Sequence, residues 1–304
     1  MVQQKVGRTT LVAGLVAGLT IGSGVSAQTL RVANLAEPPN KGDPTVSIGY
    51  QHGYVYEAIF DALTTVGGDG KPESRLASSW SNKDPSTWEF KLRANIKFHG
   101  GTPFNADAIV FAVKNLQTDD QKKFGASVYG SVRHVVEATK VDDLTVLIKT
   151  DRLAPILPNE ISAFRIVDPK VWSDLGRDKF GASPSGTGPF RVTSYPDATR
   201  FEAVRYDGGV RQPKVSNFLM YFMPEAPTRV QAFQSNAVDI SINLSADVVN
   251  LVKAAGGAIN SATTPSVLGL VFNQSKGGFT LDKRVRQALN YASDKSYTQT
   301  LLGG

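Results

Sequence analysis

The chain of 304 residues lacks cysteine altogether. Its absence excludes disulfide bonds, thiolate metal ligands, a cysteine nucleophile and a lipid anchor on an N-terminal cysteine. Histidine is nearly as scarce, because the sequence holds three, His52, His99 and His134, far apart from one another. Imidazole metal sites need neighbouring histidines or carboxylates at ligand spacing, so we expect neither a metal nor a cofactor and interpret each histidine as a surface or packing residue.

Long hydrophobic runs are missing after position 27. Before it, Lys5 and Arg8 precede an apolar run of 12 residues, Leu11–Gly22, and the small residues Val25–Ala27 follow. This order is typical of a secretory signal peptide, and 12 residues are too few to cross a bilayer core of ~30 Å. A retained membrane helix is the alternative reading. We expect a mature chain that begins near Gln28, is not lipid-anchored, and diffuses in a bacterial periplasm.

Concentrated positive charge is absent as well. The net charge is +6, but the basic residues are scattered, and Lys91 and Arg93 alternate with Phe90 and Leu92. Such alternation indicates the solvated face of a strand and not a groove for nucleic acid. We therefore expect no nucleic-acid partner.

Strand and helix patterns alternate along the chain without an internal repeat. Val55, Ile59, Leu63 and Val66 recur at helical spacing and predict a helix that ends at Gly67–Gly68. Further helices are expected after Asn105, at Pro227 with Val230, Phe233 and Ala237 on one side, and after Asp282, and strands near 30–34, 88–93, 145–148, 190–195, 200–206, 218–223 and 268–272.

The segment IKFHGGTPFNADAIVFAV, residues 96–113, has the composition of an active site. His99–Gly101 could serve as the oxyanion loop of an esterase, but the sequence has no Gly-x-Ser-x-Gly nucleophile turn, and phosphate-binding glycine patterns are absent too. A scaffold explains the segment better. Gly100 and Gly101 permit a turn, His99 braces it, and Asn105 caps the helix that follows.

Several segments resemble one family, the family 5 extracellular solute-binding proteins, which are the dipeptide, oligopeptide and nickel receptors of bacterial ABC importers. The most specific match is RLASSWSNKDPSTWEFKLRANIKFHGGTPFNADAIVFAV at 75–113. Further matches are GTGPF at 186–190, PTRVQAFQSNAVDI at 227–240 and LVFNQSKGGFTLDKRVRQALNYASDK at 270–295. Asn236–Ala237 departs from the usual glycine–acid pair, which puts local geometry in doubt more than the class.

The resemblance implies an α/β fold of the periplasmic binding protein type, class II, with an inserted small domain. It places the signal peptide at 1–27, lobe I at 28–50 and 170–268, the inserted subdomain at 51–169, and the start of lobe II at 269–304. On this map the second lobe is mostly missing, and the chain is expected to be a C-terminally truncated piece of a longer protein.

The resemblance also implies a ligand cleft between the lobes, at the strand ends of lobe I. Glu37 would receive a peptide ammonium and Tyr50 would pack against ligand side chains, although Glu37 as a solvated loop residue is an equal alternative. Arg165, in SAFRIVDP, resembles an arginine that contacts the carboxylates of a metal chelate in the nickel-receptor branch; a structural salt bridge is the alternative. The implied ligand-binding residues are Leu35, Ala36, Glu37, Tyr50, Arg165, Phe272 and Asn273.

The expected function is capture of peptides or similar small solutes by a monomer that delivers them to an ABC permease and ATPase, without catalysis. A receptor for a nickel chelate or another carboxylated solute is the alternative within this class. Two other classes stay open at this point: a secreted hydrolase that uses His99, and a periplasmic chaperone or sensor subunit that reuses the receptor fold.

Overall fold

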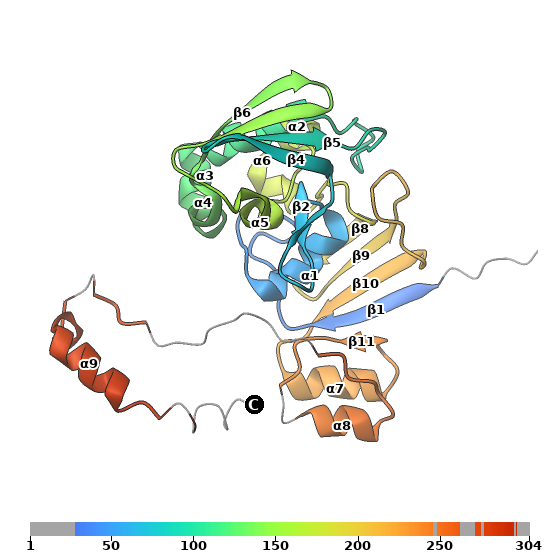
Figure 1. Ribbon diagram of the computed structural model, residues 1–304. Helices are drawn as coiled ribbons and strands as arrows, with labels where there is room; N and C mark the ends of the chain where they lie inside the picture. Colours follow the sequence, from blue (N-terminus) through green and yellow to red (C-terminus); the bar gives the residue numbers. More distant parts are fainter. Residues whose placement is uncertain (1–27, 246–247, 262–270, 275–276, 295, 297–304) are drawn as a thin grey trace, which may run out of the picture.

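The computed structural model describes residues 28–245, 248–261, 271–274, 277–294 and 296. Strands of the described chain form three sheets, and helices pack around them (Figure 1). The predicted signal peptide lies outside the described residues. Within the described residues, no helix has the length and apolar character needed to cross a membrane.

The largest sheet has five strands in the order β11-β1-β10-β9-β8 (Figure 1). Strand β1 lies between β11 and β10 and runs parallel to both, pairing Val32 with Met220 of β10 and with Ile240 of β11. The remaining pairs are antiparallel. The strand bounds are β1 Thr29–Asn34, β8 Phe190–Asp197, β9 Arg200–Arg205, β10 Asn217–Phe222 and β11 Ile240–Ser241.

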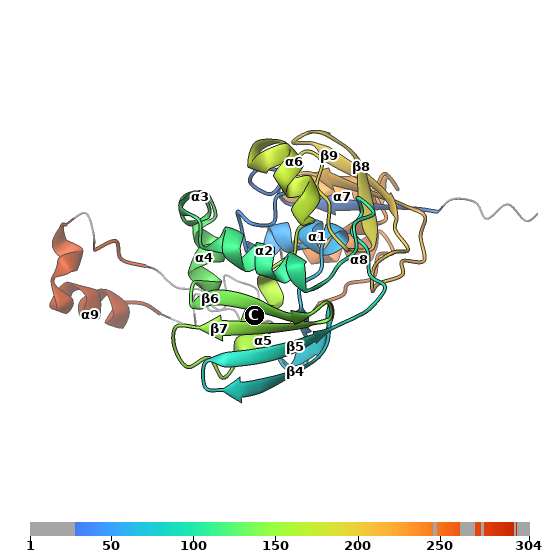
Figure 2. The same cartoon turned by 90° about the horizontal axis from the view of Figure 1, so that it is seen from above.

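A second, four-stranded antiparallel sheet has the order β4-β5-β7-β6. Helix α2 packs against its strands β6 and β7 (Figure 2). A short hairpin of β2 and β3 precedes it in the chain. The bounds are β2 Thr64–Val66, β3 Pro72–Ser74, β4 Ala77–Asp84, β5 Thr87–Leu92, β6 Val135–Asp142, β7 Thr145–Thr150 and α2 Ala106–Leu116.

The other helices connect or flank these sheets. Helix α9 lies away from both sheets in Figures 1 and 2, and none of its residues is buried. The bounds are α1 Tyr50–Ile59, α3 Asp119–Phe124, α4 Ala126–Val132, α5 Leu157–Glu160, α6 Pro169–Phe180, α7 Ala226–Gln234, α8 Val249–Ala254 and α9 Lys283–Tyr291, with 3-10 turns at Ile161–Ala163 and Phe279–Leu281.

Each of the two larger sheets has its own hydrophobic core. Aromatic rings fill the core of the five-stranded sheet, where Phe201 lies 5.6 Å from Phe218 and 5.5 Å from Tyr195, measured between ring centroids. Aliphatic side chains from α2, such as Ile109 and Val113, fill the core of the four-stranded sheet. Two separate cores of this kind indicate two folding units joined by the chain.

Most of the predicted elements are confirmed, including β1, β5, β7 to β10 and the helix after Asn105. The side chain of Asn105 caps this helix by accepting a hydrogen bond from the amide of Asp107 at 3.1 Å. Strands β4 and β6 were not predicted. Helix α7 ends at Gln234, so Ala237 lies beyond it. Of the strand expected at 268–272, residues 268–270 lie outside the described residues, and 271–272 are not in a strand.

The helix predicted from Val55 to Val66 is wrong beyond Ile59. Helix α1 ends there, Phe60 is extended, and the residues from 64 to 66 form strand β2 instead. The amide of Gly188 donates to the carbonyl of Ile59 at 2.9 Å, the acceptor that another helical turn would need. A tertiary hydrogen bond thus overrides the helical spacing.

Candidate functional site

Three parallel strands end at one edge of the five-stranded sheet. Because β1 is parallel to β10 and to β11, the carboxyl ends of all three strands, at Asn34, Phe222 and Ser241, face the same side. In open α/β sheets, ligands bind outside the carboxyl ends of the strands. Leu35, Ala36 and Glu37 follow β1 directly, so the structure places these three predicted residues at this edge.

Asn34 organises this edge, although no pattern in the sequence marks it as a site residue. Its buried side-chain amide donates to the carbonyls of Gln51 at 3.0 Å and Ala36 at 3.3 Å. Its side-chain oxygen accepts from the amide of Leu35 at 2.8 Å and from the side chain of Asn243 at 3.1 Å. One amide therefore fixes the loop after β1, the first turn of α1 and the chain that leaves β11.

Glu37 lies partly buried in this loop, and it is not a simple solvated residue. Its Oε1 atom and the hydroxyls of Tyr56 and Tyr195 are buried without a hydrogen-bond partner among the described residues. Burial raises the pKa of Glu37, while the nearby charge of Lys41 and the neighbouring hydroxyl of Tyr195 oppose the shift. The ammonium of Lys41 is held instead by the carbonyls of Tyr195 and Pro196, at 3.1 and 3.2 Å. A carboxylate with an unused oxygen can accept a cationic group.

Helix α1 presents two tyrosines to solvent beside this edge. Tyr50 is 73% exposed and Tyr54 is 45% exposed, and at a spacing of four residues they share one face of the helix. Gln51, the next residue after Tyr50, is the one that Asn34 binds. Tyr50 is therefore the neighbour of a residue that is hydrogen-bonded to the end of β1. Tyr54 adds a second ring to the exposed aromatic face.

Arg165 lies at the other end of α1, in a cluster of charges. Its guanidinium binds Glu57 of α1 at 2.5 Å and the carbonyl of Ser162. Arg211 also binds Glu57, at 3.2 Å, and pairs with the buried Asp61 at 2.9 Å. Burial lowers the pKa of Arg165, and the charge of Glu57 opposes that shift. Arg165 therefore takes part in an internal ion-pair network, as its alternative reading expected, and its contact with a ligand stays a prediction.

Phe272 and Asn273 lie in a segment without helix or strand structure. The carbonyl of Asn273 accepts from the hydroxyl of Thr280 at 3.4 Å. The contacts described for this segment do not connect it with the carboxyl edge of the sheet, so the role of both residues in binding stays a prediction.

His99 has the surroundings of a structural residue. Its Nε2 atom donates to the carbonyl of Gly188 at 2.9 Å, and its Nδ1 atom accepts from the amide of Gly186 at 3.4 Å. Burial lowers its pKa to about 4, against a weaker effect of the bond to Gly188. An imidazole with both nitrogens engaged by backbone groups is poorly placed to activate a nucleophile. His99 thus braces its turn, as the sequence predicted.

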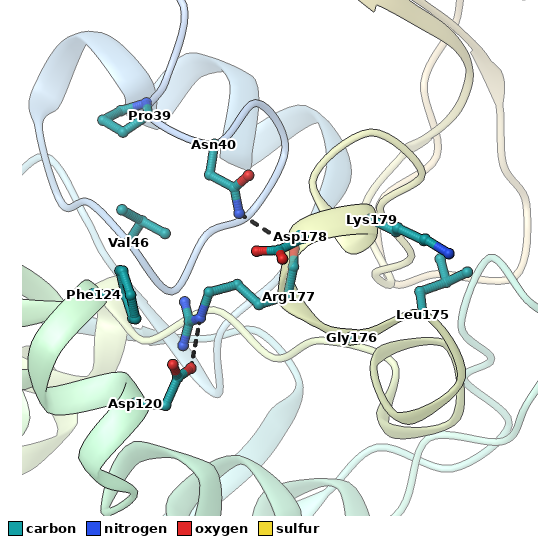
Figure 3. Close-up of a pocket in the computed structure, with 10 residues that line it drawn as sticks. All are labelled: Pro39, Asn40, Val46, Asp120, Phe124, Leu175, Gly176, Arg177, Asp178 and Lys179. Carbon is teal, nitrogen blue, oxygen red and sulfur yellow. Dashed lines mark hydrogen bonds and ion pairs between the residues drawn. The ribbon is translucent and has the colours of Figure 1, made fainter.

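A hollow of about 600 Å³ lies at a different place, between the loop around Asn40, helix α3 and the end of α6 (Figure 3). Arg177 crosses it and binds Asp120 at 2.8 Å, Gln121 at 2.6 Å and Asp43 at 3.2 Å. These partners neutralise the guanidinium of Arg177, and Lys179 and Asp178 also line the hollow. It includes none of the predicted ligand-binding residues. Across the described residues, no group of three or more histidine or carboxylate side chains is placed to hold a metal ion.

Comparison with known proteins gives consistent results. A family model described as bacterial extracellular solute-binding proteins, family 5 Middle, matches residues 71–304. The dipeptide-binding protein of Escherichia coli (strain K12) is 28% identical, in an alignment that covers 96% of this chain and 59% of that protein. The glutathione-binding protein GsiB of Pectobacterium atrosepticum is 24% identical, covering 79% of this chain and 47% of that protein.

Solved structures share the fold. The crystal structure of NikZ from Campylobacter jejuni in complex with Ni(L-His) aligns with a TM-score of 0.71 at 20% identity, covering 88% of this chain and 54% of that one. The α/β architecture predicted from the sequence is therefore confirmed as that of periplasmic binding proteins. The chain spans about half the length of these relatives, from 47% to 59%. The lobe boundaries expected from the sequence stay predictions.

Proposed function

The chain belongs to the bacterial extracellular solute-binding proteins of family 5, and we propose that it captures peptides or similar small solutes in the periplasm for an ABC importer. The observation that carries this proposal is the carboxyl edge of the three parallel strands, where Asn34 fixes the loop that holds Glu37. The partners would be a membrane permease and its ATPase. The relatives named above are binding proteins by name, which supports a role without catalysis.

A peptide ligand fits the chemistry of this edge. The buried Oε1 atom of Glu37 has no hydrogen bond of normal geometry within the described residues, and the Tyr195 hydroxyl is a neighbour of the carboxylate. An α-ammonium group would supply stronger, charged donors to this carboxylate. Tyr50 and Tyr54 offer an exposed aromatic face on which ligand side chains could pack with little loss of side-chain entropy. Charge at one point and apolar surface beside it is the usual composition of a small-molecule site.

A carboxylated solute or a nickel chelate is the second candidate. Its support is Arg165, whose buried Nε atom has no hydrogen-bond partner in the described part of the chain. A carboxylate that displaced Glu57 could take a bidentate bond from this guanidinium. Because Glu57 already occupies the guanidinium at 2.5 Å, we rank this candidate below peptides.

A thermal-shift screen of the purified protein tests both candidates. The probes are the dipeptide Ala-Phe, glutathione, and nickel supplied as its L-histidine complex. A ligand at 100 times its Kd stabilises the folded state by about 2.7 kcal/mol, which is readily measured. Stabilisation by the dipeptide supports the peptide proposal. A shift with the nickel complex alone would reject it in favour of the second candidate, and no shift with any probe rejects both.

The importer role has its own test. Adjacent permease and ATPase genes would support it, and uptake of labelled Ala-Phe should be lost when the gene for this chain is deleted. Uptake that persists unchanged would instead favour a chaperone or sensor role. A hydrolase that uses His99 predicts ester hydrolysis that disappears in His99→Ala, and the bonds of that ring to Gly186 and Gly188 argue against this class.

A further inference from the structure

We propose that Arg229 and Asn243 form a positioning relay that holds the loop after β1 in its binding conformation. The relay runs from a buried guanidinium, through the chain that leaves β11, to the amide of Asn34. Its role in ligand binding rests on the function proposed above, while its role in ordering the loop stands on the geometry alone.

Arg229, on helix α7, is the most deeply placed charge of this region. It is 1% exposed, and its guanidinium donates to four backbone carbonyls. The acceptors are Met223 at 2.6 Å, Pro224 at 2.8 Å, Ile242 at 3.1 Å and Asn243 at 2.7 Å. Burial lowers the pKa of Arg229, and the charge of Glu225 opposes the shift. A planar group with donors on all three nitrogens can serve four carbonyls together, whereas an ammonium cannot.

These carbonyls lie directly after the two strands that flank β1. Met223 and Pro224 follow β10, and Ile242 and Asn243 follow β11, so the guanidinium ties both neighbours of β1 at their carboxyl ends. The amide of Met223 in turn donates to the carbonyl of Asn34 at 2.8 Å. Arg229 therefore connects the ends of β10 and β11 at the edge of the sheet where the candidate site lies.

Asn243 transmits this fixation. Its backbone has a φ of 57°, the left-handed conformation that asparagine tolerates better than most residues. Held there by Arg229, its side chain donates to Asn34 at 3.1 Å. Asn34 then binds the amide of Leu35 and the carbonyl of Gln51. Three buried or half-buried polar side chains thus connect α7 to the loop of Glu37 and to the first turn of α1.

The test uses two relay variants and a matched control. Asn243→Gly keeps the left-handed backbone but removes the side-chain donor, and Arg229→Lys keeps the charge but not the planar fork. Arg177→Lys is the control, because Arg177 is another guanidinium with several hydrogen-bond partners, although these are side chains and not backbone carbonyls. It lies at the hollow and not at the strand edge. Hydrogen–deuterium exchange is measured for peptides that cover residues 33–37 and 49–52, together with affinity for Ala-Phe by calorimetry.

We expect Asn243→Gly and Arg229→Lys to speed exchange at 33–37 and 49–52 at least tenfold and to weaken Ala-Phe binding at least tenfold. Arg177→Lys should change exchange near Asp43 and Asp120 and leave both of those peptides within twofold of wild type. Exchange within twofold of wild type in Asn243→Gly overturns the relay, even if Arg229→Lys fails to fold. Wild-type protein that binds none of the probes rejects the proposed function and leaves the exchange result to decide the relay.

Discussion

Replacing His99 by glutamine should flatten part of the dependence of stability on pH. The buried imidazole is neutral, with Nε2 donating to Gly188 and Nδ1 accepting from the amide of Gly186. A proton can only be added at Nδ1, where it would face an N–H group and lose an acceptor. Glutamine can keep a donor toward Gly188 but does not titrate, so the comparison isolates protonation.

The magnitude follows from the pKa of His99, which burial lowers to about 4, against about 6.5 for a free histidine. The unfolded chain takes up this proton first as pH falls, so stability is intact above the free value and is lost progressively between pH 6.5 and 4. At pH 5 the histidine of the unfolded chain is protonated, because the pH lies about 1.5 units below its pKa, while His99 of the folded protein is still mostly neutral. At ~1.4 kcal/mol for each unit, this difference lowers the free energy of unfolding by about 2 kcal/mol.

Urea unfolding of wild type and His99→Gln at pH 7, 6 and 5 measures this loss. The free-energy gap between the two proteins should narrow by about 2 kcal/mol from pH 7 to pH 5. All other titrating groups, including His52, whose pKa burial also lowers, are present in both proteins and cancel. A gap that stays constant across the three pH values would refute the reasoning and show that His99 is not held neutral by its surroundings.

Three further substitutions have defined outcomes. Gly188→Ala would place a Cβ atom 2.5 Å from the backbone of Ile59 and should lower the free energy of unfolding in urea by about 3 kcal/mol or more. Gly130→Ala is its control, because Gly130 has open space around it, and should change stability by less than about 1 kcal/mol. Equal effects of the two substitutions would contradict the close approach of Gly188 to Ile59. Glu37→Gln should lower Ala-Phe affinity at least tenfold in calorimetry without destabilising the fold, and unchanged affinity would remove Glu37 from the site. Arg165→Met removes the hydrogen bond to Glu57 and should lower the free energy of unfolding by about 1–3 kcal/mol, while Ala-Phe affinity stays within twofold of wild type. A large loss of affinity would show that Arg165 contacts the ligand directly.

The elements that the sequence predicts well are those whose burial pattern is local. The helix after Asn105 has its cap, its acidic first turn and its buried stripe within 12 residues, and the predicted cap is confirmed. Strand β5 alternates Phe90 and Leu92 with polar residues and is confirmed as well. Strand β4 was not predicted because most of its side chains are exposed and polar, so that its place depends on pairing with β5 and not on its own composition.

The candidate site was predictable only in part, because its contacts join residues far apart in the chain. The family resemblance directed attention to Leu35–Glu37 and Tyr50, which lie at the strand edge. Asn34 and Asn243, which connect them, are separated by 209 residues, and a polar residue at a strand end carries no local sign of such a bond. Arg229 likewise falls within a helical segment whose pattern gives no indication that the guanidinium is buried.

The segment 96–113 connects the two hydrophobic cores. The amide of His99 donates to the carbonyl of Gly186 at 2.8 Å, and the hydroxyl of Thr102 donates to Asp168 at 2.8 Å. A Cβ atom on Gly100 would lie 2.7 Å from the carboxylate of Asp168, so the turn has little room for any other residue. Buried polar groups that are fully hydrogen-bonded specify one arrangement of the cores that they connect. The cluster of histidine, glycine and threonine is therefore a structural connection between the cores, while ligand binding is proposed for the residues after β1.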